Sequence, residues 1–141
     1  MKIRPILKED YKEVAELIIN ELGYSEQKHE DIYKRLEVIK KSDNYQTLVC
    51  CTEQHIIGFI GLCRFVTYEK EDYISILSLV VSEQYQQKGV GKLLLSAAKK
   101  YAIDNGVTQI KASCAFHREY AHYFYEKNGF DRTSLTFIAQ L

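Results

Sequence analysis

The sequence predicts a mixed α/β fold, in which a sheet of antiparallel and parallel strands carries helices on both faces. Two observations predict it. Strand-like and helix-like segments alternate through the second half of the chain, and the first half holds two strand-like runs joined by a polar turn, as in a hairpin. The chain has 141 residues, within the ~100 to 200 typical of one domain. We therefore expect residues 1–141 to form a single domain.

Composition and charge narrow the functional classes. Hydrophobic residues make up 46% of the chain and charged residues 27%, and 19 basic residues balance 19 acidic ones. No long-range field would draw such a protein to nucleic acid or to an anionic membrane. No apolar run approaches the ~20 residues that span a bilayer, and charges interrupt the N-terminus where a signal peptide would be apolar. We expect a cytoplasmic protein without nucleic-acid or membrane partners.

The four cysteines show no metal-binding spacing. Cys50, Cys51, Cys63 and Cys114 contain no CxxC pair, and adjacent residues of a strand point to opposite faces. We expect reduced, packed thiols and no metal site. A nucleophilic Cys114 is the alternative.

The first half of the chain predicts an edge strand, two helices and a hairpin. Pro5 suits an edge strand because it has no N–H to donate, and Gly23 suits the end of the first helix. In the second hairpin strand, Gly58 and Gly61 indicate a bulge or a close approach of another backbone. The expected segments are strands at 2–6, 47–51 and 56–66, and helices at 8–22 and 26–41.

The second half predicts the alternating elements. The apolar, β-branched run at 73–81 indicates a buried strand, and the apolar face of residues 89–105 indicates an amphipathic helix that Gly106 ends. A strand at 107–114, a helix at 119–128 and one or two strands at 130–141 should follow.

The loop between the buried strand and the amphipathic helix is the most informative segment. It reads Gln86, Gln87, Lys88, Gly89, Val90, Gly91, Lys92. The first N–H groups of a helix lack internal partners and carry the positive end of the helix dipole, so glycines there let the backbone approach phosphate oxygens. A plain strand-to-helix turn would also use two glycines.

Two other phosphate motifs do not fit the loop. A P-loop requires a glycine at the position of Gln86 and a Ser or Thr at Leu93. A dinucleotide fingerprint requires a third glycine at Leu94, and its loop follows the first strand of a βαβ unit. Nucleotide hydrolysis and dinucleotide binding are therefore disfavoured.

The loop resembles the coenzyme A signature of the GNAT N-acetyltransferase superfamily, (Gln/Arg)-x-x-Gly-x-(Gly/Ala). Gln86, Gly89 and Gly91 match it in full. Residues 79–81 look like the end of the family's central strand, and residues 124–130 look like its later (Phe/Leu)-Tyr-x-x-x-Gly-(Phe/Tyr) motif. The resemblance implies the GNAT fold, acetyl-CoA as cosubstrate and an amine acceptor. It implies cofactor contacts from Leu79, Val80, Val81, Gln86, Gln87, Lys88, Gly89, Val90, Gly91, Lys92, Arg118 and Tyr125.

The same resemblance implies how the donor is held. The strand ending at residues 79–81 should splay from its parallel neighbour at 109–114, and the pantetheine arm should fill the wedge by pairing with free backbone groups. A backbone N–H near Val80 or Val81 should stabilise the developing oxyanion.

The residue that deprotonates the amine is less clear. Several family members carry a carboxylate on the central strand, where this chain has Ser75 and Ser78. Glu71 and Tyr73 lie an even number of residues before Ser75, so either could face the same side of the strand and move the proton through water. Glu71 is the candidate base. By resemblance, Tyr125 should protonate the leaving thiolate. The alternative for Tyr125 is an aromatic side chain that packs beside Phe124.

The acceptor is the least determined part. The pattern Arg-x-x-Ala-His-x-Phe-Tyr from Arg118 to Tyr125 is similar to aminoalkylphosphonate N-acetyltransferases, which implies a small-molecule amine. Arg118 could clamp an anionic group of that substrate or form a surface ion pair, and His122 could be a base or a packed side chain. A protein N-terminus or lysine as acceptor, a coenzyme A sensor without catalysis, and a homodimer remain open.

Overall fold

The computed structural model describes residues 1–141 as two compact units, residues 1–111 and residues 112–141. The first unit contains most of the sheet and three of the four α-helices, and the second contains α4 and the C-terminal segment. None of the helices has both the length and the apolar composition required to cross a bilayer.

A five-stranded sheet with the order β1-β2-β3-β4-β5 organises the first unit. β1 to β4 pair antiparallel with their neighbours, and β5 follows α3 and lies beside β4, the crossover arrangement of parallel strands. The mixed sheet is confirmed. The bounds are β1 Lys2–Pro5, β2 Tyr45–Cys51, β3 Ile56–Phe65, β4 Tyr73–Val81 and β5 Ile110–Ala112.

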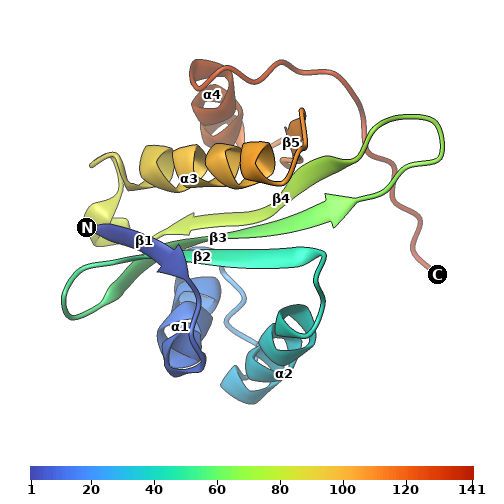
Figure 1. The fold of residues 1–141 in the computed structure, drawn as a ribbon. Helices are drawn as coiled ribbons and strands as arrows, with labels where there is room; N and C mark the ends of the chain where they lie inside the picture. Colours follow the sequence, from blue (N-terminus) through green and yellow to red (C-terminus); the bar gives the residue numbers. More distant parts are fainter. The chain divides into compact units, whose positions relative to one another are not determined.

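Helices cover both faces of the first unit's sheet, with α1 and α2 on one face and α3 on the other (Figure 1). Each corresponds to a helix that the apolar spacing predicts, although α2 begins three residues later than expected. The 3₁₀ turn Lys8–Asp10 leads into α1 Tyr11–Glu21, and α2 His29–Lys40 and α3 Val90–Asp104 follow.

The core between the sheet and the first two helices determines where α1 lies. Val14 and Ala15 of α1 and Val49 of β2 have no exposed surface, and Phe59 and Val80 of β3 and β4 are buried in the same cluster. Burying one such aliphatic or aromatic side chain contributes about 1.5–3 kcal/mol. The cluster therefore fixes α1 over the strands that lead to the predicted loop.

A buried carboxylate joins β1 to the start of α1. Asp10 is 4% exposed, and it accepts hydrogen bonds from both terminal nitrogens of Arg4, at 2.6 and 3.0 Å, and from the Leu7 N–H at 2.7 Å. These donors favour the ionised form, with Arg4 the larger cause, and lower the Asp10 pKa. The pairing satisfies a charge that would otherwise be costly to bury.

The second unit corrects one prediction. It contains α4 Glu119–Lys127, but residues 130–141 form no strand, and β5 covers only three of the residues expected at 107–114. A strand requires a partner to satisfy its backbone, and the sheet ends at β5. The apolar side chains that suggested strands are exposed instead: Leu135, Phe137, Ile138 and Leu141.

Candidate functional site

The end of β4 is tied to β3 and to the loop that follows it. The Ser82 N–H donates to the Ile57 carbonyl at 2.8 Å. The side-chain nitrogen Nε2 of Gln86 donates to the Val81 carbonyl at 3.0 Å. Gln86, the glutamine of the predicted signature, therefore has a structural role. It holds the loop against the strand whose backbone should receive the cofactor.

The loop reverses direction through a 3₁₀ turn and two residues of positive φ. The turn Glu83–Tyr85 is anchored to α1, because the Glu83 N–H donates to the Glu21 carboxylate at 3.2 Å. Gln87 (φ 61°) and Gly89 (φ 86°) are left-handed, a conformation that glycine adopts without steric cost. Gly89 precedes the first residue of α3, which explains why the signature requires glycine there.

The first turn of α3 presents unpaired backbone donors. The Leu93 N–H is bonded to the Gly89 carbonyl at 3.0 Å, and no side chain caps the helix, so the N–H groups of Val90, Gly91 and Lys92 have no partner within it. α3 has 15 residues, and its first turn contains no carboxylate side chain. Its dipole and these donors suit phosphate oxygens.

Two lysines border this turn. Lys88 and Lys92 are exposed, and the Lys88 ammonium lies 5.7 Å from the centre of the Tyr85 ring. Neither forms an ion pair with a carboxylate within the chain. Both charges therefore remain available to an anion at the start of α3.

α3 and the end of β4 lie close to the backbone of β3 at Gly58. A Cβ added at Gly58 would lie 2.8 Å from the Val80 carbonyl, 3.2 Å from Leu94 and 3.4 Å from Val90. The sequence prediction of a close approach at this glycine is confirmed. Because the nearest atom is backbone, a side chain here would displace the end of β4 or the start of α3.

The edge of β4 that faces β5 is unpaired over its last part. Pairing begins where the Ile74 N–H donates to the Gln109 carbonyl at 3.1 Å, and β5 has three residues whereas β4 has nine. At about 3.3 Å per residue in both strands, β5 accompanies β4 only to about Leu77. Backbone groups at 77–81 on this edge have no neighbouring strand to bond to.

A β-bulge lies where that free edge begins. Leu62 pairs with Ile76 and Gly61 pairs with Ser78, so Leu77 has no partner on β3. The bulge confirms that Gly61 marks an irregularity. Bulges redirect side chains and are frequent beside active sites.

The bulge brings Ser75 and Ser78 to one face. Ser75 pairs with Cys63, Ser78 with Gly61 and Val80 with Phe59. The three partners are two residues apart along β3, so they point to one face, and Phe59 and Val80 place that face against α1. Ser75, Ser78 and Val80 therefore lie on the α1 face of the sheet. This face of β4 carries no carboxylate between residues 73 and 81. At the two positions where the sequence resemblance led us to expect a base, this face therefore carries serines.

Glu71 lies at the other end of β4. It precedes the first residue of the strand by two positions, and its carboxylate accepts a hydrogen bond from the Thr108 hydroxyl at 3.1 Å. Eight residues separate it from Leu79, about 25 Å of extended chain. The structure does not bring this predicted base to the free edge, and its role stays a prediction.

Tyr125 lies within an aromatic group of the second unit. Its ring is 5.4 Å from that of Phe124 and 5.2 Å from that of Phe130, both edge to face. Burial, and secondarily the Cys114 thiol, raise the pKa of Tyr125 to about 12. The phenol therefore keeps its proton at neutral pH, as a general acid must.

The other two candidates on α4 differ in their surroundings. His122 Nε2 lies 2.8 Å from the Ala115 carbonyl, so one ring nitrogen is already engaged. Arg118 precedes α4 as its N-cap residue, and its charge opposes the burial that raises the Cys114 pKa. Arg118 forms no ion pair with a carboxylate.

A cavity of about 340 Å³ lies between α1 and the loop after β4. Three carboxylate residues of α1 border it, together with the β2–β3 turn and the loop: Glu13, Glu16, Glu21, His55 and Tyr85 are among the lining residues. Glu13 accepts a hydrogen bond from the Ile56 N–H at 3.0 Å. Sequence analysis did not single out these glutamates, because their spacing is also that of an ordinary solvated helix face.

Comparisons with known proteins identify the family. Residues 6–130 match the model of the acetyltransferase (GNAT) family. The uncharacterized N-acetyltransferase YhdJ of Bacillus subtilis (strain 168) is 30% identical over 109 residues, which cover 77% of each chain. A GNAT family acetyltransferase of Staphylococcus aureus is 27% identical with a TM-score of 0.83, over 99% of this chain and 98% of its own.

A more distant likeness concerns the fold alone. The aminoglycoside 6'-N-acetyltransferase AAC(6')-IG of Acinetobacter haemolyticus has a TM-score of 0.85 at 15% identity, covering 100% of this chain and 99% of its own.

Gly58→Ala tests the close approach. The added methyl must displace the Val80 carbonyl or α3, so we expect a loss of about 1–3 kcal/mol in the free energy of unfolding and weaker coenzyme A binding by calorimetry. Gly61→Ala is the matched control, because its nearest neighbour would be the Ser78 nitrogen at 4.0 Å. Equal coenzyme A affinity in the two variants would contradict the assigned role of Gly58.

Proposed function

The chain belongs to the GNAT acetyltransferase family, and from this premise we propose that it acetylates the primary amine of a small molecule. GNAT enzymes use acetyl-CoA, so the chain is an acetyl-CoA-dependent acetyltransferase. The observation that carries the rest is the conjunction, in one unit, of an unpaired β4 edge with an uncapped α3 N-terminus. The acceptor class and the residue roles below are proposals.

The proposed donor site uses the backbone more than side chains. The pyrophosphate accepts hydrogen bonds from the first turn of α3, with Lys88 and Lys92 adding positive charge and Gln86 keeping the loop in place. The amides of the pantetheine arm pair with the free edge at 79–81, as an added strand would. Arg118 and Gln87 are proposed as further cofactor contacts.

The proposed reaction is direct attack of a neutral amine on the thioester carbonyl. The nitrogen lone pair forms the new C–N bond, and the carbonyl oxygen becomes an oxyanion that a backbone N–H near Val80 or Val81 stabilises. As the tetrahedral intermediate collapses, the C–S bond breaks and Tyr125 donates its proton to the leaving thiolate. The proton that the attacking nitrogen loses passes through water to the Tyr125 phenolate and restores the phenol. The raised pKa of Tyr125 supports this role, because the phenol is still protonated when the proton is required.

A small cationic amine is the proposed acceptor. An amine of lysine-like pKa near ~10 is mostly protonated before it enters a site, and the carboxylates of Glu13, Glu16 and Glu21 border the cavity of about 340 Å³ beside the loop. A negative lining attracts such cations. Aminoglycosides, which the AAC(6')-IG enzyme acetylates, are polyamines of this kind.

Thiol release from acetyl-CoA, measured with a panel of amines, tests the proposal. We expect turnover with small polyamines or aminoglycosides, and little with peptides that carry a lysine or a free N-terminus. Turnover with peptides alone would contradict the acceptor class. Tight acetyl-CoA binding without turnover on either panel would contradict the proposed catalysis.

Tyr125→Phe tests the general acid. The variant keeps the aromatic packing with Phe124 and Phe130 but has no proton to donate, so we expect kcat to fall about 10²-fold or more, far more than the affinity for acetyl-CoA. Because the Tyr125 pKa is about 12, the phenol is protonated throughout pH 7 to 10. The loss should therefore have the same size across this range, and a loss that shrinks toward pH 10 would oppose the assignment.

A further inference from the structure

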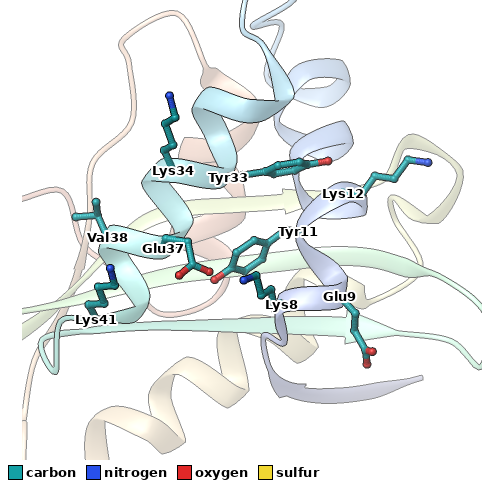
Figure 2. Close-up of a pocket in the computed structure, with 9 residues that line it drawn as sticks. All are labelled: Lys8, Glu9, Tyr11, Lys12, Tyr33, Lys34, Glu37, Val38 and Lys41. Carbon is teal, nitrogen blue, oxygen red and sulfur yellow. The ribbon is translucent and has the colours of Figure 1, made fainter.

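A second cavity in the first unit lies away from the acetyl-CoA loop, between the start of α1 and the last half of α2 (Figure 2). Its volume is about 600 Å³, within the ~300 to 1,000 Å³ of small-molecule sites. The lining residues come from two segments: Lys8, Glu9, Tyr11 and Lys12 from the first, and Tyr33, Lys34, Glu37, Val38 and Lys41 from the second.

α1 itself separates this cavity from the loop. Tyr11 is the first residue of α1 and lines the cavity, whereas Glu21 is the last and binds the Glu83 N–H of the loop. A helix of 11 residues spans about 16 Å. A ligand at the Tyr11 end would therefore occupy a different place from the phosphates of acetyl-CoA.

The cavity is positively charged. Four lysines and two glutamates line it, and none of the lysines forms an ion pair. Lys8 and Lys12 are four residues apart, a spacing at which like charges on a helical turn destabilise one another. An anion placed among these ammonium groups would relieve the repulsion.

A buried hydroxyl at the cavity is also unsatisfied. Tyr11 is 5% exposed, and its oxygen has no hydrogen-bond partner of acceptable geometry. Figure 2 shows this oxygen directed toward the Glu37 carboxylate, and burial, followed by the hydrogen bonding and charge of Glu37, raises the pKa of Tyr11 to about 12. The hydroxyl is therefore a protonated donor that faces Glu37 without a well-aligned hydrogen bond, and a poorly satisfied buried donor is costly.

Two aromatic rings supply an apolar wall. The centres of Tyr11 and Tyr33 lie 6.4 Å apart with the rings inclined at 33°, and both residues line the cavity. A ligand with a flat apolar body could pack there while an anionic group reaches the lysines.

From these observations we propose that the cavity between α1 and α2 binds a small organic anion, a carboxylate or phosphate ester with an aromatic body. The lysines provide its charge complement, the Tyr11 hydroxyl donates a hydrogen bond to it, and Tyr33 packs against its ring. The site requires no contact with the acetyl-CoA loop, so it stands whether or not the proposed acceptor is correct.

Phenyl phosphate tests the proposal, titrated into the full chain with saturating coenzyme A so that the α3 N-terminus is occupied. We expect saturable binding by calorimetry, weakening as ionic strength rises, with the NMR amide shifts concentrated at Tyr11, Tyr33 and Glu37. Benzylammonium, which has the opposite charge, should not bind. Binding of benzylammonium in preference to phenyl phosphate, or shifts confined to the α3 N-terminus, would overturn the proposal.

Substitutions of lysines test whether the charges that line the cavity are responsible for binding. The double variant Lys12→Gln/Lys41→Gln should lose about tenfold in phenyl phosphate affinity, and Glu37→Gln should gain affinity because it removes a negative charge. Lys40→Gln is the matched control, since Lys40 is exposed on the same helix but does not line the cavity. Equal losses in Lys40→Gln and in the double variant would refute a defined site.

Tyr11→Phe tests the hydroxyl separately. It keeps the ring and should lower phenyl phosphate affinity several-fold while thermal stability is largely maintained, because the native hydroxyl has no well-aligned hydrogen bond to lose. Unchanged phenyl phosphate affinity in a folded Tyr11→Phe protein would exclude the donor role of this hydroxyl.

Discussion

The structure of the first unit depends on one constraint: β4 continues after its neighbour β5 has ended. β5 has three residues beside the nine of β4, so the last backbone groups of β4 on that edge have no strand partner. Unpaired backbone groups are costly when buried. A ligand with amide groups can satisfy them, which gives a physical reason for the proposal that this edge binds the pantetheine arm of acetyl-CoA.

The rest of the proposed donor site requires α3 to begin beside the free end of β4. Gly58 removes the side chain that would keep α3 away from the Val80 carbonyl, and Gly89 adopts the left-handed conformation that begins the helix. Gln86 and Glu21 then hold the intervening loop to β4 and to α1. The donors proposed to bind phosphate and the free edge are thereby fixed relative to one another within one unit.

Hydrophobic periodicity predicted most of the helices and strands, because each buries one face, and turn residues predicted where they end. The strand at 73–81 and the helices of the first unit are confirmed within a few residues, and the family is confirmed from the loop and its flanking motifs. Gly61 predicted an irregularity in its strand, but the position of the bulge opposite it, at Leu77, was not predicted because it depends on the register with β3. The prediction of C-terminal strands was wrong, because the apolar pattern of a segment does not show whether a neighbouring strand is available to pair with it.

Amide hydrogen exchange, with and without coenzyme A, measures the central claim directly. If the free β4 edge receives the pantetheine arm and the start of α3 receives the phosphates, exchange should slow at residues 77–81 and 90–92, with little change at β1 and β2. Protection confined to residues 90–92, with the 77–81 amides exchanging as before, would contradict the account of β4 as an edge that the cofactor completes.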